Sequence, residues 1–237
     1  MGRQFLWKEI LFLMAYNSNS RRSKTKMLAI LGVLCALAYV VLLFVRIPAV
    51  MFLKYEPKDV IITIAGFLFG PLASIAVSVV VSLIEMVTIS DTQIIGFVMN
   101  VLSSVSFAGT AAVIYKHKRT LGGAVAGLAV GTIAMVIIML LWNYLITPLY
   151  MHVPRSDVAG MLFPVFLPFN LVKGLLNAAI TLLIYKPVVR GLTRAHLIES
   201  NHSGTRPSKG SVIAVILVSL FIIATGTLVI LAWQGII

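Results

Sequence analysis

Six long apolar runs set the strongest constraint on how this chain can fold. They occur at about 27–46, 60–89, 94–115, 121–146, 167–187 and 212–234. An α-helix needs about 20 apolar residues to cross a bilayer, where every backbone polar group must be hydrogen-bonded within the protein. The runs are near or above that length. The sequence therefore predicts an all-α integral membrane protein that spans the bilayer several times.

Composition agrees with this class. The chain has 237 residues, of which 60% are hydrophobic and 11% are charged, whereas soluble domains carry about 25% charged residues. The 19 basic residues outnumber the 7 acidic ones and give a formal charge of +12. In a soluble protein this excess would suggest a nucleic-acid partner. Here membrane topology explains it better, and we expect no nucleic acid.

The second apolar run is long for one helix, and Gly70-Pro71 interrupts it where a helix would kink or end. Splitting the run there gives seven spans, with the N-terminus inside, the C-terminus outside and the two halves short or tilted. Fourteen of the 19 basic residues then face the cytoplasm, as the positive-inside rule favours. The remaining five are Arg46, Lys54, Lys58 and Arg155 outside, and Lys173 within a span.

A lysine inside a span is costly to insert and usually has a partner or a ligand. Lys173 lies in the stretch PFNLVKGLLNAAITLLIY, on one helical stripe with Asn170 and Asn177. The topology places it in the outer leaflet, about 9 Å below the start of its span. Other intramembrane polar residues fall at a similar depth on three more helices: Glu85, Thr88, Asn100, Asn143 and Thr147. Hydrogen bonds between helices could explain any one of them, but together they favour a ligand pocket that opens outward.

The residue types suggest what such a pocket would bind. Lys173 and Glu85 could neutralise each other, so the ligand need not be charged. The expected neighbours are apolar or aromatic, namely Met99, Trp142, Tyr144 and Phe169. Amide side chains provide a donor and an acceptor together, which matches the edge of a heterocycle. The first outer loop, RIPAVMFLKYEPKD, could close over the ligand, although a plain connector remains the alternative.

The search for chemistry gives mostly negative results. The sequence contains no GxxxxGK[ST] motif and no HExxH motif, and its four histidines (His117, His152, His196 and His202) are scattered. We therefore expect no catalytic residues, no metal and no cofactor. The single cysteine, Cys35, forms no disulfide within the chain. Two mechanisms remain: a stand-alone carrier coupled to an ion through Glu85, or uptake driven by a partner that hydrolyses ATP. A membrane enzyme or a structural subunit is disfavoured because no nucleophile and base can be paired.

Four motifs carry a resemblance to a known family. FLKYEPKD, GFLFGPL, NYLITPLY and PFNLVKG resemble segments of the riboflavin-specific S components of energy-coupling-factor (ECF) transporters, and the likeness covers about residues 25 to 192. The resemblance implies a six-helix bundle in the bacterial cell membrane that captures riboflavin at the outer side. It also implies that a separate transmembrane scaffold with two ATPases powers release into the cytosol. An S component for another vitamin or heterocycle is the alternative.

The resemblance also implies roles for particular residues. Asn143, Asn170 and Lys173 would hold the polar edge of the flavin, Glu85 would assist, and the loop with Phe52 and Leu53 would cover the site. Docking on the scaffold would use small residues of the first helix, here Ala29, Gly32 and Ala36. The Gly32–Ala36 pair could equally serve packing within the bundle.

These inferences divide the chain into four parts. Residues 1–26 form a cytoplasmic segment, interpreted as an interfacial helix, and residues 27–190 form the six-helix binding domain. Residues 191–211 form a cytoplasmic linker, and residues 212–237 hold an extra transmembrane helix that departs from the six-helix pattern.

Overall fold

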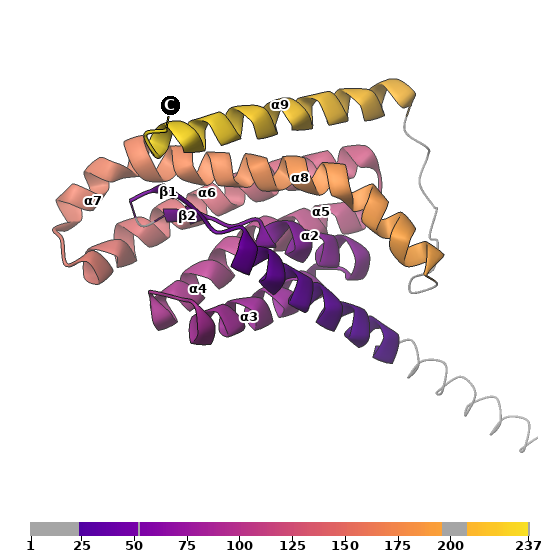
Figure 1. The fold of residues 1–237 in the computed structure, drawn as a ribbon, viewed down its shortest axis with the longest axis horizontal. Coiled ribbons are helices and arrows are strands. Elements are labelled where there is room, and N and C mark those ends of the chain that lie inside the picture. Colours follow the sequence, from indigo (N-terminus) through magenta and orange to yellow (C-terminus); the bar gives the residue numbers. More distant parts are fainter. Residues whose placement is uncertain (1–23, 52, 196–207, 237) are drawn as a thin grey trace, which may run out of the picture.

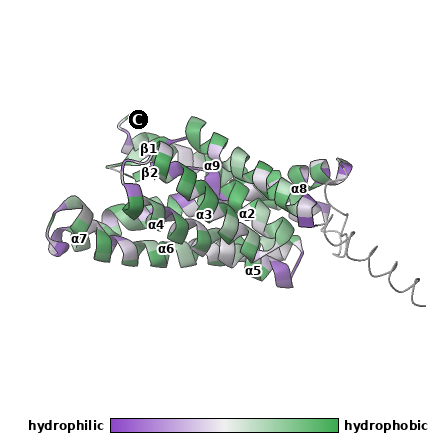
Figure 2. Ribbon diagram, turned by 90° about the horizontal axis from the view of Figure 1, so that it is seen from below, coloured by the Kyte–Doolittle hydropathy of each residue, from purple (hydrophilic) through white to green (hydrophobic). Residues whose placement is uncertain are grey.

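The protein is a bundle of long helices that run side by side, with a small β-hairpin at one end (Figure 1). The computed structural model describes residues 24–51, 53–195 and 208–236. The predictions for residues 1–23, Phe52 and 196–207 lie outside this part of the chain. The bundle's flanks are largely hydrophobic (Figure 2), as expected of surfaces that face lipid.

The elements follow one another in a simple order. An N-terminal helix over Lys24–Phe44 leads into the hairpin of β1 (Ile47–Val50) and β2 (Leu53–Tyr55). The helices that follow are α2 (Lys58–Phe69), α3 (Pro71–Thr88), α4 (Gln93–Ser104), α5 (Thr110–His117), α6 (Leu121–Met151), α7 (Arg155–Met161), α8 (Leu167–Arg194) and α9 (Lys209–Trp233).

The predicted break in the second apolar run is confirmed. Gly70 separates α2 from α3 with φ +94° and ψ 174°, a backbone conformation essentially confined to glycine, and Pro71 begins α3. By length and apolar composition alone, six helices among the described residues could cross a membrane, compared with the seven spans that the split predicts. The exception is α2, which has 12 residues. It packs against α3, α5 and α8, so neighbouring protein surrounds it where lipid would otherwise be.

Two π-helical turns lie inside longer helices. Val105–Gly109 joins α4 to α5, and Leu162–Phe166 joins α7 to α8, so each pair crosses as one continuous helix. Such turns often occur at functional sites. The sixth span predicted at 167–187 therefore begins earlier, at Arg155, and it ends later, at Arg194.

The connection after the N-terminal helix is a hairpin rather than the loop that the sequence suggested. β1 and β2 pair antiparallel, with Ile47 opposite Tyr55 and Val50 opposite Leu53. Its apolar residues Ala49 and Leu53 are buried in one cluster with Val158, Phe166 and Phe169. Burial against α7 and α8 holds the hairpin in place. The sequence did not indicate these strands, because they have only four and three residues and the first contains Pro48.

Candidate functional site

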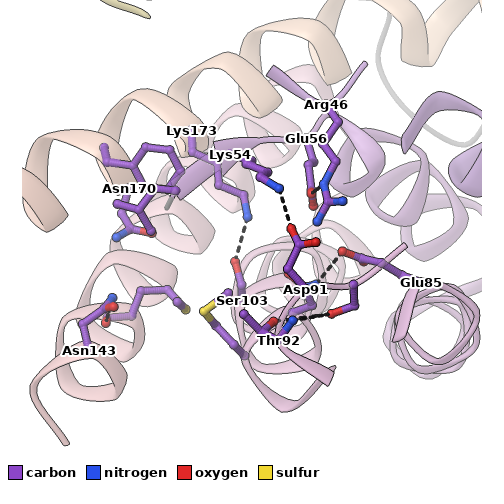
Figure 3. Close-up of a pocket in the computed structure, with 16 residues that line it drawn as sticks. Arg46, Lys54, Glu56, Glu85, Asp91, Thr92, Ser103, Asn143, Asn170 and Lys173 are labelled. Carbon is purple, nitrogen blue, oxygen red and sulfur yellow. Dashed lines mark hydrogen bonds and ion pairs between the residues drawn. The ribbon is translucent and has the colours of Figure 1, made fainter. Parts of the chain in front are cut away.

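A cavity of about 270 Å³ lies beneath the hairpin, between α3, α4, α6 and α8 (Figure 3). This volume is near the lower end of the range of small-molecule sites, about 300 to 1,000 Å³. Five residues named from the sequence line it: Leu53, Glu85, Asn143, Asn170 and Lys173. The expected neighbours Met99, Asn100 and Phe169 also line it.

Other polar and aromatic residues expected here lie elsewhere. Thr147 and Trp142 line a much smaller hollow between α4 and α6. Tyr144 is 37% exposed, with the guanidinium of Arg155 5.5 Å from its ring centre. Asn177 is fully buried in α8 one turn beyond Lys173 and does not reach the cavity, and Thr88 bonds to Tyr39.

The charged partner of Lys173 is Asp59, a residue that was not predicted from the sequence to be part of the site. The Lys173 ammonium donates to the hydroxyl of Ser103 at 3.3 Å and lies 3.6 Å from Asp59 Oδ2. Lys173 is therefore paired with Asp59, whereas Glu85, which could have neutralised it, is paired with Lys58. Lys173 is 7% exposed and lines the cavity, so its ammonium is held at the wall with hydrogen-bonding capacity left for a ligand.

Asp59 is the centre of a buried polar network below the cavity. Its carboxylate accepts from Ser104 and, at 3.4 Å, from the amide of Asn177. Asn177 in turn accepts from the hydroxyl of Tyr55 at 3.1 Å. Burial and the charge of Asp59 raise the pKa of Tyr55, which keeps this hydroxyl protonated as a donor. The network links the hairpin to α2 and α8.

Glu85 belongs to a second network with Lys58 at its centre. Lys58 donates to Glu85 and lies 3.0 Å from Glu56 Oε2. Glu85 also accepts from Asn100 at 2.9 Å. Lys58 is 0% exposed, so the expectation that it lies in an outer loop is wrong: the hairpin folds inward and carries the start of α2 into the protein.

The charges in the two networks balance once the part-buried Arg46 is included. Its Nε donates to Glu56 at 3.0 Å, and it adds a third cation to the buried Lys58 and Lys173, against the buried Glu56, Asp59 and Glu85. Burial of Glu56 disfavours its charge, but Lys58, Lys173 and Arg46 outweigh this and lower the pKa of its carboxyl. Balanced charge agrees with the sequence-based expectation that the ligand need not be charged.

The two asparagines are oriented by their own helices. The amide nitrogen of Asn143 donates to the Met139 carbonyl at 2.7 Å, and that of Asn170 donates to the Phe166 carbonyl at 2.8 Å. Pro168 lies in the first turn of α8, just after the π-helical turn. The amide oxygen of Asn170 is left facing the cavity (Figure 3). Met99, Met139 and Phe169 add apolar surface to the cavity beside the two asparagines.

An ion pair spans the mouth of the cavity. Lys54 Nζ on β2 lies 2.7 Å from Asp91 Oδ2 in the connection between α3 and α4. Both residues line the cavity (Figure 3). The hydrogen bond and charge of Lys54 hold the pKa of Asp91 below its usual range. This pair ties the hairpin to the opposite rim.

The residues missed by sequence reasoning share one signal. Glu56, Lys58 and Asp59 are consecutive charges, separated only by Pro57, directly before an apolar run. The sequence places these charges in the first outer loop or next to it. In the structure all three side chains are buried, each 5% exposed or less. Among the described residues, no group of three His, Cys, Asp or Glu side chains could hold a metal ion.

A multi-pass helical bundle with a neutral, half-polar cavity under a hairpin at one end defines a membrane-embedded small-molecule binding protein. The sequence model of the family described as "ECF transporter, substrate-specific component" matches residues 26–185. The chain belongs to this family of transporter components and is not an enzyme.

Individual relatives agree with the family. The chain is 33% identical to the riboflavin transporter RibU of Staphylococcus aureus, over 74% of this chain and 99% of that protein. It is 30% identical to the riboflavin transporter FmnP of Bacillus subtilis, over 73% of this chain and 99% of that protein. A solved S component of a bacterial ECF transporter superposes with a TM-score of 0.60 at 33% identity, covering 72% of this chain and 99% of that one. The family match ends before α9.

Proposed function

We propose that this protein captures riboflavin in the cavity under the hairpin and delivers it for uptake. The observation that carries the proposal is the cavity's lining, which sets apolar side chains beside amide and charged ones. The apolar members are Leu53, Met99, Met139 and Phe169, and the polar members include Asn143, Asn170 and Lys173. A flavin ring has the same division, with an apolar dimethylbenzene side and an edge of alternating donors and acceptors. The relatives that this chain matches over 99% of their length are named riboflavin transporters, which supports the same ligand.

Energy for uptake comes from partners in this proposal. The sequence has no phosphate-binding loop of its own, and the family is a component of larger transporters. A transmembrane scaffold subunit with two ATPases would supply the work. An ion-coupled carrier acting through Glu85 is less well supported, because Lys58 and Asn100 already engage both carboxylate oxygens.

Charge supports a cytoplasmic N-terminus in the bacterial cell membrane. The start of the N-terminal helix, the end of α5, the end of α8 and the start of α9 lie at the end of the bundle opposite the hairpin (Figure 1). Those segments carry Lys24, Lys26, Lys116, Lys118, Lys186, Arg190, Arg194 and Lys209. The positive-inside rule therefore favours a cytoplasmic location for this end, with the cavity near the outer face.

The test is direct binding by the purified full-length protein. Flavin that co-purifies would show as a yellow chromophore, and titration of apo-protein should quench flavin fluorescence with one site per chain, without ATP or sodium. Thiamine serves as the control vitamin and should not compete. Absence of riboflavin binding would overturn the ligand, and binding that required sodium or ATP would overturn the partner-driven mechanism.

A further inference from the structure

The C-terminal helix α9 lies outside the family match, yet it is closely packed on the binding domain. It contacts α8 along its length and β1 at its C-terminal end (Figures 1 and 2). Gly226 faces Leu176 of α8 so closely that a Cβ there would be 2.7 Å from a Leu176 methyl carbon. Such close approach indicates a specific helix–helix contact.

The end of α9 meets the hairpin directly. Trp233 packs against two buried clusters that contain hairpin residues, one with Ala49 and Leu53 and the other with Tyr55. Ile230, 5% exposed, lies in the second cluster with Tyr55 and Leu176. The side-chain amide of Gln234 donates to the backbone carbonyl of Pro48 on β1 at 2.5 Å.

The same hairpin also forms part of the cavity. Leu53 and Lys54 of β2 line the cavity, and the hydroxyl of Tyr55 reaches Asn177, which bonds to Asp59. A movement that exposes the cavity mouth would have to lift the hairpin, because Lys54 and Asp91 close it there. Lifting β1 would break the contacts of Trp233 and Gln234.

We infer that α9 is a strap that holds the hairpin closed over the ligand, with Trp233 and Gln234 as positioning residues for substrate retention. The inference rests on the proposed function, because it assigns a role in keeping the same ligand. A helix that only anchored the chain in lipid would need no contact with the hairpin. Loss of these contacts should therefore speed the release of riboflavin much more than it lowers the melting temperature of the protein.

The test compares release rates of riboflavin, measured by flavin fluorescence after dilution or competition, in full-length variants. Gln234→Ala should release riboflavin about two- to tenfold faster, the effect of losing one hydrogen bond, and Trp233→Ala with Gln234→Ala should release it faster still. Phe221→Ala is the matched control, since Phe221 is 71% exposed on α9. It should release ligand at the parent rate.

Hydrogen exchange and melting temperature separate the strap from a general loss of structure. Backbone amides of β1 and β2 should exchange faster in the double variant while those of α3 and α6 remain protected. Parental release in both variants, or equal acceleration by Phe221→Ala, would overturn the inference. If the double variant has a lower melting temperature than the parent, the test rests on Gln234→Ala alone. Release of riboflavin from that variant at the parent rate would then overturn the inference. A parent protein that binds no riboflavin would instead refute the proposed function.

Discussion

Lys173 lines the cavity and also lies beside the buried carboxylate of Asp59. Ligand binding and neutralisation of Asp59 must therefore be tested separately. The Lys173 ammonium lies 3.6 Å from Asp59 and lines the cavity. A hydrogen bond from a charged donor contributes about 1.5 to 3 kcal/mol. We therefore expect Lys173→Met to weaken riboflavin binding by roughly ten- to a hundredfold, as measured by fluorescence titration.

A double variant provides the control. Lys173→Met leaves Asp59 buried without its cation, which destabilises the protein, whereas adding Asp59→Asn removes the unpaired charge. The double variant should regain melting temperature but not affinity. Recovery of parental affinity would mean that Lys173 only neutralises Asp59 and does not contact the ligand.

The ion pair between Lys54 and Asp91 predicts a dependence on pH and salt. Because the pKa of Asp91 is lowered by Lys54, the pair is intact above that pKa and is lost as the pH falls through it. The riboflavin release rate should be flat between about pH 8 and 5, where an aspartate is ionised, and should rise in stronger acid. Since the pair is exposed, high salt should speed release by no more than about fivefold.

Asp91→Asn serves as the matched variant. It keeps the shape of the side chain but removes its charge, so release should be faster at neutral pH and should lose most of its response to salt. If parent and Asp91→Asn respond alike, the pair does not hold the hairpin.

At the scale of elements, the break between α2 and α3 depends on one glycine. Gly70 has φ +94° and ψ 174°, where a Cβ costs about 1 to 3 kcal/mol. Gly70→Ala should lower the melting temperature of the purified protein. Gly191→Ala is the control, because Gly191 is helical in α8 with nothing within 4 Å of an added Cβ. An equal or smaller effect at Gly70 would contradict the strain argument.

The elements also show how far the sequence could be read. Apolar length and Gly70-Pro71 were enough to place the long helices and the break, because bilayer thickness and backbone sterics are local constraints. The hairpin was not predicted, since its strands are held by Val158 and Phe166, more than 100 positions away. Lys58 was misplaced because its partner Glu85 lies on another helix, α3. Four of the proposed site residues, Glu85, Asn143, Asn170 and Lys173, line one cavity because intramembrane polar side chains avoid lipid.

At the scale of the whole molecule, the candidate binding site and the proposed docking residues lie on different surfaces. The cavity draws on β2, α3, α4, α6 and α8, whereas the proposed docking residues Ala29, Gly32 and Ala36 are exposed on the N-terminal helix. The buried face of that helix carries Ile30, Leu34, Ala38 and Leu42. Packing of Gly32 within the bundle, the alternative left open by the sequence, is wrong, because nothing lies within 4 Å of a Cβ added there.

Capture and uptake should therefore be separable by mutation. Gly32→Leu combined with Ala36→Leu places two large side chains one turn apart where a partner helix could otherwise approach closely. Because neither residue lines the cavity, the riboflavin affinity of the purified variant should stay within about threefold of the parent. Such a change in affinity is smaller than the loss of one typical hydrogen bond would cause. Uptake of labelled riboflavin by cells that contain the whole transporter should be lost.

Control substitutions of the same kind test whether position rather than bulk matters. Ala126→Leu on α6 and Ala224→Leu on α9 add side chains to other exposed helix faces and should leave uptake unchanged. Normal uptake with Gly32→Leu and Ala36→Leu would remove this face from the coupling mechanism. If the controls block uptake equally, bulk anywhere on the lipid-facing surface is harmful, and the partner contact has no special place on the N-terminal helix. Loss of uptake confined to the N-terminal helix, with affinity retained, would locate the coupling surface on a face that the ligand never touches.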